Sequence, residues 1–212
     1  MRQRLGNLFF GLFLYGLGIV VTLRSNLGTT PWDALHAALT AYIPLTMGQI
    51  GQVTGLIIIL LSMLIGMQPG WGTLANMYFI GVFIDFFLGQ SWLSAPDTFW
   101  WQLAMLLGGV WIIGWASYFY MVAALGAGPR DSFMVGAVRK SGWPVWKIRT
   151  AIEGSVALSA YALGGPVGIG TVIIALTLGP AIQFSFRLMG KRAQDIEHEG
   201  WKPDWRKKTG SA

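Results

Sequence analysis

The chain has 212 residues, of which 54% are hydrophobic and only 11% charged, with a mean hydropathy of +0.55 and a formal net charge of +6. A soluble domain usually carries about 25% charged residues, so this composition excludes a water-covered surface and indicates a membrane protein. The sequence contains no cysteine, which excludes disulfides, thiol catalysis, thiolate metal sites and iron–sulfur clusters.

Six apolar stretches of about 19–22 residues are each long enough to cross a hydrocarbon core of about 30 Å as a helix. They are residues 5–23, 47–65, 71–89, 102–123, 145–163 and 170–189. The first stretch lacks a small-residue cleavage site, so it is predicted to be a retained helix rather than a signal peptide. Two further segments, 31–43 and 129–138, are long enough for only half a bilayer.

The sequence contains an internal repeat. Residues 5–88 align without a gap on the residues 98 positions later, so that Leu27–Asp33 matches Leu125–Asp131 and Gly66–Thr73 matches Gly164–Thr171. The shared residues are mostly Gly, Pro, Asp and Thr, which decide backbone shape. This pattern predicts an all-α, polytopic helical membrane protein built from two tandem homologous repeats.

We divide the chain into a first membrane repeat (1–89), a linker (90–101), a second membrane repeat (102–189) and a basic tail (190–212). If the two short segments dip and return, the chain crosses six times and the repeats are inverted. If they cross, there are eight crossings and the repeats are parallel. The linker has no Lys or Arg, which favours an outside position and hence inverted 3+3 spans.

Basic residues lie at both ends of the chain, which predicts that the N- and C-termini are cytoplasmic. We expect the basic tail to lie in the cytoplasm and to be attracted to anionic lipid. Nucleic-acid binding is not expected, because no other basic surface remains outside the membrane.

The repeated turn predicts the start of a short helix in each repeat. Thr30 stands at the N-cap and Asp33 at the third helical position, and Gly128 is the cap in the second repeat. Two half-helix N-termini that meet near mid-membrane attract an anion or a polar solute. The predicted solute-binding residues of these turns are Gly28, Thr29, Thr30 and Asp33, with Gly126, Gly128, Arg130 and Asp131. Alternatively, the two carboxylates only cap their own helices.

Two Gly-x-Gly-Thr segments each open a long helix. Thr73 and Thr171 are predicted to be the N-caps of these helices, and the alternative places their hydroxyls in the polar cavity as solute ligands. Neither segment is a phosphate loop, because each lacks the Gly-Lys-Ser/Thr ending.

Ionisable residues inside apolar stretches are candidates for function. Glu153 is a predicted solute or proton ligand, although it could instead pair with Arg149 one turn earlier. His36 is a second candidate for proton coupling, and simple packing of its ring is the alternative. Asp85 lies near the end of its stretch and aligns with Gln183.

The segments Leu27–Leu35 and Gly164–Thr171 resemble those of the YczE/YitT group of bacterial integral membrane proteins, closest to the YczE-like branch. The resemblance covers residues 5–189 and implies a location in the bacterial inner (plasma) membrane. It implies no activity, because the group is poorly characterised.

The sequence favours a secondary transporter or facilitator of a small polar or anionic organic solute, with its site between the repeats. A non-transporting accessory or scaffold protein and a solute-binding subunit of a larger uptake system are the alternatives. No enzymatic constellation is recognised, and no metal or cofactor is expected. The expected partners are membrane lipid and the solute, and homo-oligomer formation stays open.

Overall fold

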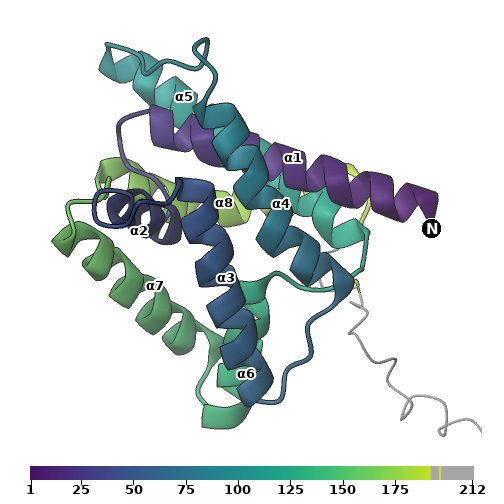
Figure 1. Ribbon diagram of the computed structural model, residues 1–212. Coiled ribbons are helices and arrows are strands. Elements are labelled where there is room, and N and C mark those ends of the chain that lie inside the picture. Colours follow the sequence, from purple (N-terminus) through teal and green to yellow (C-terminus); the bar gives the residue numbers. More distant parts are fainter. Residues whose placement is uncertain (192–195, 197–212) are drawn as a thin grey trace, which may run out of the picture.

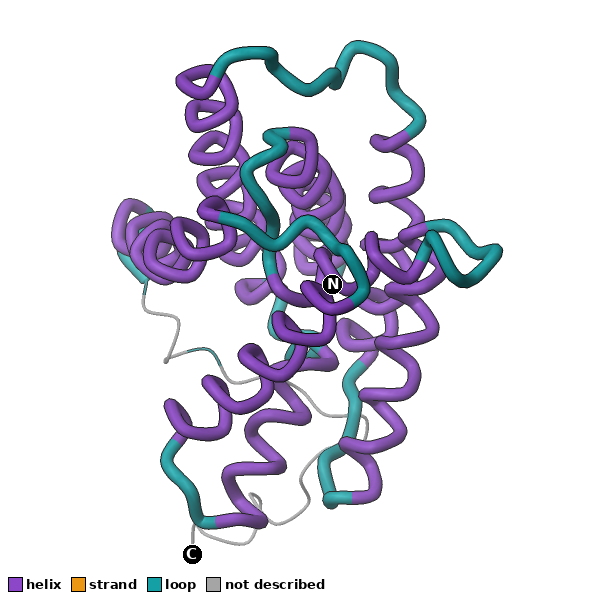
Figure 2. The backbone as a smooth tube through the Cα atoms, turned by 90° about the vertical axis from the view of Figure 1, so that its left-hand side faces the viewer, coloured by secondary structure: helices purple, strands orange, loops and turns teal. Residues whose placement is uncertain are grey.

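The computed structural model describes residues 1–191 and 196, and the predicted tail falls largely outside the described residues. Eight helices and no strand occur in this described part (Figure 1). They are α1 (Arg2–Arg24), α2 (Pro31–Leu39), α3 (Met47–Leu64), α4 (Trp71–Leu88), α5 (Phe99–Val122), α6 (Pro129–Ser141), α7 (Val145–Ala162) and α8 (Ile169–Leu188). Figure 2 shows these helices joined by loops. The all-helical prediction is confirmed, and the two short segments are α2 and α6.

Five helices of the described part are long and apolar enough to cross a membrane: α1, α3, α4, α5 and α8. The chain is therefore a multi-pass membrane protein. The sixth predicted stretch, α7, forms a helix as long as α3 but is not among the five. Three charged side chains in its first half, Lys147, Arg149 and Glu153, make it less apolar.

The longest helices, α1 and α5, pack on each other, run antiparallel and lie in the upper part of Figure 1. Gly11 faces the backbone of Tyr120, and Gly109 faces Thr22 at the other end of the contact. A Cβ at either glycine would lie 2.6 Å from its nearest neighbour atom, so these positions require glycine for close packing. Each of the two contacts is the counterpart of the other, 98 residues on.

Apart from the contact of α3 with α4, the main contacts of the remaining helices occur in matching pairs. Helix α4 packs on α1 as α8 packs on α5, and α2 packs on α7 as α6 packs on α3. The short helix of each repeat therefore lies against a long helix of the other repeat.

The repeated turns dock on the opposite repeat. The Leu27 carbonyl accepts a hydrogen bond from the Gly170 amide at 2.7 Å, and the Leu125 carbonyl accepts one from the Gly72 amide at 2.7 Å. Gly28 and Gly126 follow these carbonyls with φ of +113° and +136°, a conformation that L side chains rarely adopt. The Leu-Gly-x-x-Pro-x-Asp turn of each repeat therefore contacts the Gly-x-Gly-Thr segment of the other repeat.

The predicted N-cap role of the two threonines is wrong. The caps of α4 and α8 are Gly70 and Gly168, and Thr73 and Thr171 stand three residues later. Their hydroxyls accept hydrogen bonds from the cap amides at 3.0 and 3.2 Å. At Gly168 the turn of the other repeat approaches too closely for a side chain, because a Cβ there would lie 2.6 Å from the Leu27 carbonyl oxygen.

Candidate functional site

The N-terminus of α2 is built as the turn predicts. Thr30 is the N-cap, and its hydroxyl accepts from the Asp33 amide at 3.3 Å. The same hydroxyl donates to the Asp33 carboxylate at 2.5 Å. Capping therefore occupies one carboxylate oxygen of Asp33, whose side chain is 3% exposed.

The second carboxylate oxygen of Asp33 faces the start of α6. It lies 4.0 Å from a guanidinium nitrogen of Arg130, a side chain that is 41% exposed. The Arg130 guanidinium also stacks on the Trp32 indole, with its Cζ 4.8 Å from the ring centroid. The N-termini of α2 and α6 thus meet through a cation and an aromatic ring, and a half-buried charge remains between them.

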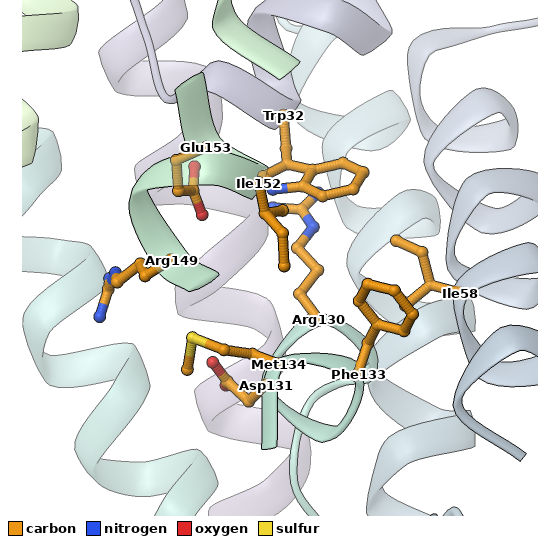
Figure 3. Close-up of a pocket in the computed structure, with 9 residues that line it drawn as sticks. All are labelled: Trp32, Ile58, Arg130, Asp131, Phe133, Met134, Arg149, Ile152 and Glu153. Carbon is orange, nitrogen blue, oxygen red and sulfur yellow. The ribbon is translucent and has the colours of Figure 1, made fainter. Parts of the chain in front are cut away.

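A small cavity of about 40 Å³ lies beside this contact (Figure 3). Four helices line it: Trp32 of α2, Ile58 of α3, a group on α6 and a group on α7. The two groups are Arg130, Asp131, Phe133 and Met134 on α6, and Arg149, Ile152 and Glu153 on α7. At about 10–15 Å³ for each water, this space holds roughly three water molecules.

The α7 side of the cavity carries two of the candidate charges. Figure 3 shows the Glu153 carboxylate on the same side as the indole nitrogen of Trp32, while the Arg149 guanidinium points away. No ion pair within 4.0 Å joins Glu153 to Arg149 in the described part of the chain, so the alternative role of Glu153 as the partner of Arg149 is not observed. The buried indole N–H of Trp32 lacks an acceptor in hydrogen-bond geometry among the described residues. The Trp32 indole and the Glu153 carboxylate therefore face each other and form the polar side of the cavity.

The other predicted site residues are buried outside the cavity lining. The Thr29 hydroxyl bonds to the Thr22 hydroxyl at 3.0 Å, and the Thr73 hydroxyl donates to the Ala127 carbonyl at 2.6 Å. Thr171 lies against Gly28 in the matching contact. The structure thus brings Arg130, Asp131 and Glu153 together at one cavity, and Asp33 contacts Arg130. Thr73 and Thr171 instead lie at the contact between the repeats.

His36 is buried on α2, with its side of α2 facing Gly51 of α3. A Cβ at Gly51 would lie 3.4 Å from the Nδ1 atom of His36. The Nε2 atom has no hydrogen-bond partner among the described residues. The ring is therefore packed rather than hydrogen-bonded at that atom, and it is not part of the cavity lining.

Sequence reasoning missed Trp32 as a site residue, together with the apolar walls Ile58, Phe133, Met134 and Ile152. One signal could have found Trp32: it aligns with Arg130 in the repeat. Two equivalent residues that meet across an interface lie close to the axis that relates the repeats. Since Arg130 is a predicted site residue, its equivalent Trp32 could have been predicted as well.

A larger hollow of about 350 Å³ lies between α5 and α8. Its lining includes Leu107, Trp111, Leu176 and Phe184, and none of its residues is charged. Such a lining offers no group that would hold a polar solute, so the smaller charged cavity remains the candidate site.

Comparisons with known proteins agree with this picture of a membrane protein. Residues 2–187 match the model of a family of unknown function, DUF6198. The chain is 38% identical over 179 residues to the uncharacterized membrane protein YczE of Bacillus subtilis, covering 84% of this chain and 82% of that protein. It is 29% identical to an uncharacterized protein of Haemophilus influenzae, covering 87% of this chain and 84% of that protein.

A third relative, the uncharacterized protein YyaS of Bacillus subtilis, is 27% identical and covers 77% of this chain and 82% of its own length. No solved structure matches the chain. The resemblance to the YczE-like branch is confirmed by the family match and by the identity to YczE over most of both chains. The chain belongs to the DUF6198 family of YczE-like membrane proteins.

Proposed function

We propose that the protein is a secondary transporter or facilitator of a small polar or anionic organic solute. The observation that carries this proposal is the contact between Trp32 and Arg130, which are equivalent residues of the two repeats and meet at a charged cavity. Sites at the interface of two repeats, formed by broken or short helices, are typical of secondary transporters. The half-exposed Arg130 guanidinium suits an anionic group of the solute.

The proposal includes inverted 3+3 spans with the linker outside and both termini in the cytoplasm. It is supported by the antiparallel contact of α1 with α5, because equivalent helices of inverted repeats cross a membrane in opposite directions. It is also supported by the basic residues Arg139, Lys140 and Lys147 near the α6–α7 connection, on the side assigned to the cytoplasm.

The carrier needs a second conformation, because about 40 Å³ is too small for an organic solute. The wall most suited to move is α7, which buries only Ala160. A displacement of α7 would enlarge the cavity on the side that carries Glu153.

A thermal-shift screen of the detergent-purified protein against metabolites tests binding. A solute at 100 times its Kd adds about 2.7 kcal/mol of stability. The shift from a true ligand should weaken in Asp131→Asn and Glu153→Gln. The matched control is Asp97→Asn, which changes a carboxylate in the exposed linker, outside the cavity lining.

Uptake into proteoliposomes then separates a carrier from a binding protein. The expected result is saturable flux of the screened ligand that falls in Glu153→Gln and not in Asp97→Asn. Absence of flux for every anionic metabolite tested, with and without a pH gradient, contradicts the transport proposal.

The small cavity also favours a second candidate, a non-transporting accessory protein with a filled centre. This candidate predicts no thermal shift with any metabolite. It also predicts that a membrane partner co-purifies and that its recovery is independent of Glu153.

A further inference from the structure

The two repeats differ in how their third and fourth helices meet. Helix α3 packs closely on α4, whereas the equivalent pair α7 and α8 has no comparable contact. In Figure 1, α7 lies at the edge of the molecule. The contrast is also visible in burial, since α3 has seven buried residues and α7 has one.

The contact of α3 with α4, which we name the latch, is made by Thr46, Gly48, Gly81 and Asp85. The Asp85 carboxylate accepts from the Thr46 hydroxyl at 2.5 Å and from the Gly48 amide at 2.8 Å. Gly48 and Gly81 bring the two backbones together, because a Cβ at Gly81 would lie 2.5 Å from the Gly48 carbonyl oxygen. A carboxylate that accepts from a helix N-terminus is a strong, charge-assisted contact.

Every element of the latch except one glycine is replaced in the second repeat. The counterparts 98 residues on are Pro144, Trp146, Gly179 and Gln183. Proline offers no hydroxyl, glutamine carries no charge, and the Trp146 indole keeps α7 further from its neighbour than Gly48 keeps α3 from α4. Gly179 accordingly has open space around the position of a Cβ.

The unlatched helix is also the one that carries charge to the cavity. Glu153 and Arg149 of α7 stand at the positions where α3 has Gly55 and Gly51. Gly55 packs on Met77 of α4, so this glycine lies at the close contact of the first repeat, while its counterpart Glu153 lies on the helix that lacks such a contact.

We propose that the protein alternates between two conformations. In the one described here, the latch holds α3 on α4 and α7 stands off α8. In the other, α7 closes onto α8 and the latch opens. The sequence difference biases the protein towards the first conformation, because only the first repeat has the Asp85 hydrogen bonds. This proposal rests on the carrier function proposed above and names the helix that gates its site.

Paired spin labels test the alternation in the full chain, reconstituted in lipid nanodiscs. Leu45→Cys with Phe86→Cys reports the latch, and Trp143→Cys with Phe184→Cys reports the equivalent gap 98 residues on. All four side chains are exposed. Because the chain has no native cysteine, each pair is labelled without background.

Without further change, the latch pair should give mainly short distances and the α7–α8 pair mainly long ones. Asp85→Asn should raise the long-distance population of the latch pair about tenfold, the size expected when a charge-assisted hydrogen bond becomes a neutral one. The α7–α8 pair should gain short distances to the same extent. Asp97→Asn should leave both distributions unchanged.

The proposal is overturned if Asp85→Asn lengthens the latch pair while the α7–α8 pair stays long, or if neither pair changes. If Asp85→Asn does not fold, Thr46→Val removes one of the two hydrogen bonds to Asp85, together with the cap that Thr46 makes with the Gln49 amide, and should give the same pattern with a smaller amplitude. The distances are measured without solute. A chain that alternates and transports nothing therefore contradicts the carrier function and leaves the conformational proposal standing.

Discussion

Arg130 and Trp32 occupy the same position of the two repeats, and in the folded chain the guanidinium of one stacks on the indole of the other. The first repeat supplies the ring and the buried carboxylate Asp33, and the second supplies the cation. The two turns therefore carry complementary partners at one equivalent position, Trp32 and Arg130. The contact joins the two repeats and at the same time forms a wall of the cavity.

The contact of Arg130 with Trp32 and Asp33 should contribute measurably to the free energy of unfolding. Arg130→Met removes both the stacking and the counter-ion of Asp33, and we expect a loss of about 1–3 kcal/mol, less than for a fully buried pair because Arg130 is 41% exposed. Arg130→Lys keeps the charge and should lose less. Thermal unfolding in detergent measures both variants. Adding Asp33→Asn to Arg130→Met should recover part of the loss, and strict additivity of the two changes would show that the residues are uncoupled.

The repeated turns require glycine for two separable reasons. Gly28→Ala and Gly126→Ala introduce both a strained φ and a close approach to the other repeat, and each should cost about 1–3 kcal/mol or more. Gly142→Ala has φ of +70° and open space, so it reports the strain alone and should cost less. Equal losses at all three positions, measured by thermal unfolding, would remove the close approach from the explanation.

The matched threonines should differ in their contribution to stability. The Thr73 hydroxyl accepts from the Gly70 amide and donates to the Ala127 carbonyl in a fully buried position. Thr73→Val leaves both groups without a partner and should cost about 1–3 kcal/mol. Thr171→Val breaks the bond to the Gly168 amide and should cost less. The serine variants keep the hydroxyl and serve as controls. A larger loss at Thr171 than at Thr73 would contradict this order.

The role of His36 can be tested by replacing it with the residue at the equivalent position of the other repeat. Met134 occupies the equivalent position, so His36→Met is a substitution already present in the fold. We expect no loss of thermal stability, because the Nε2 atom of His36 has no partner to lose among the described residues. If His36 couples solute movement to protons, the variant should retain downhill flux in proteoliposomes and lose its response to a pH gradient. An unchanged response assigns His36 to packing.

The sequence by itself determined the helices and their pairing into two copies. Apolar length located the spans, and the two turn motifs located α2 and α6, because Gly, Pro and capping residues act locally on the backbone. Thr30, Asp33 and Gly128 took the capping positions expected from their spacing. These features depend on neighbours within about four residues, which a sequence displays directly.

Only the tertiary structure decided that each motif contacts the other repeat rather than its own. Leu27 and Gly170 lie in different repeats and are hydrogen-bonded, and no local rule predicts a partner so far along the chain. The same holds for the pairing of Arg130 with Trp32 and for the latch that Asp85 makes with Thr46. A duplicated sequence contains each motif twice, and the sequence does not say whether a motif contacts its own repeat or the other one. Packing decides this, because these contacts form between surfaces that exist only after the helices have assembled.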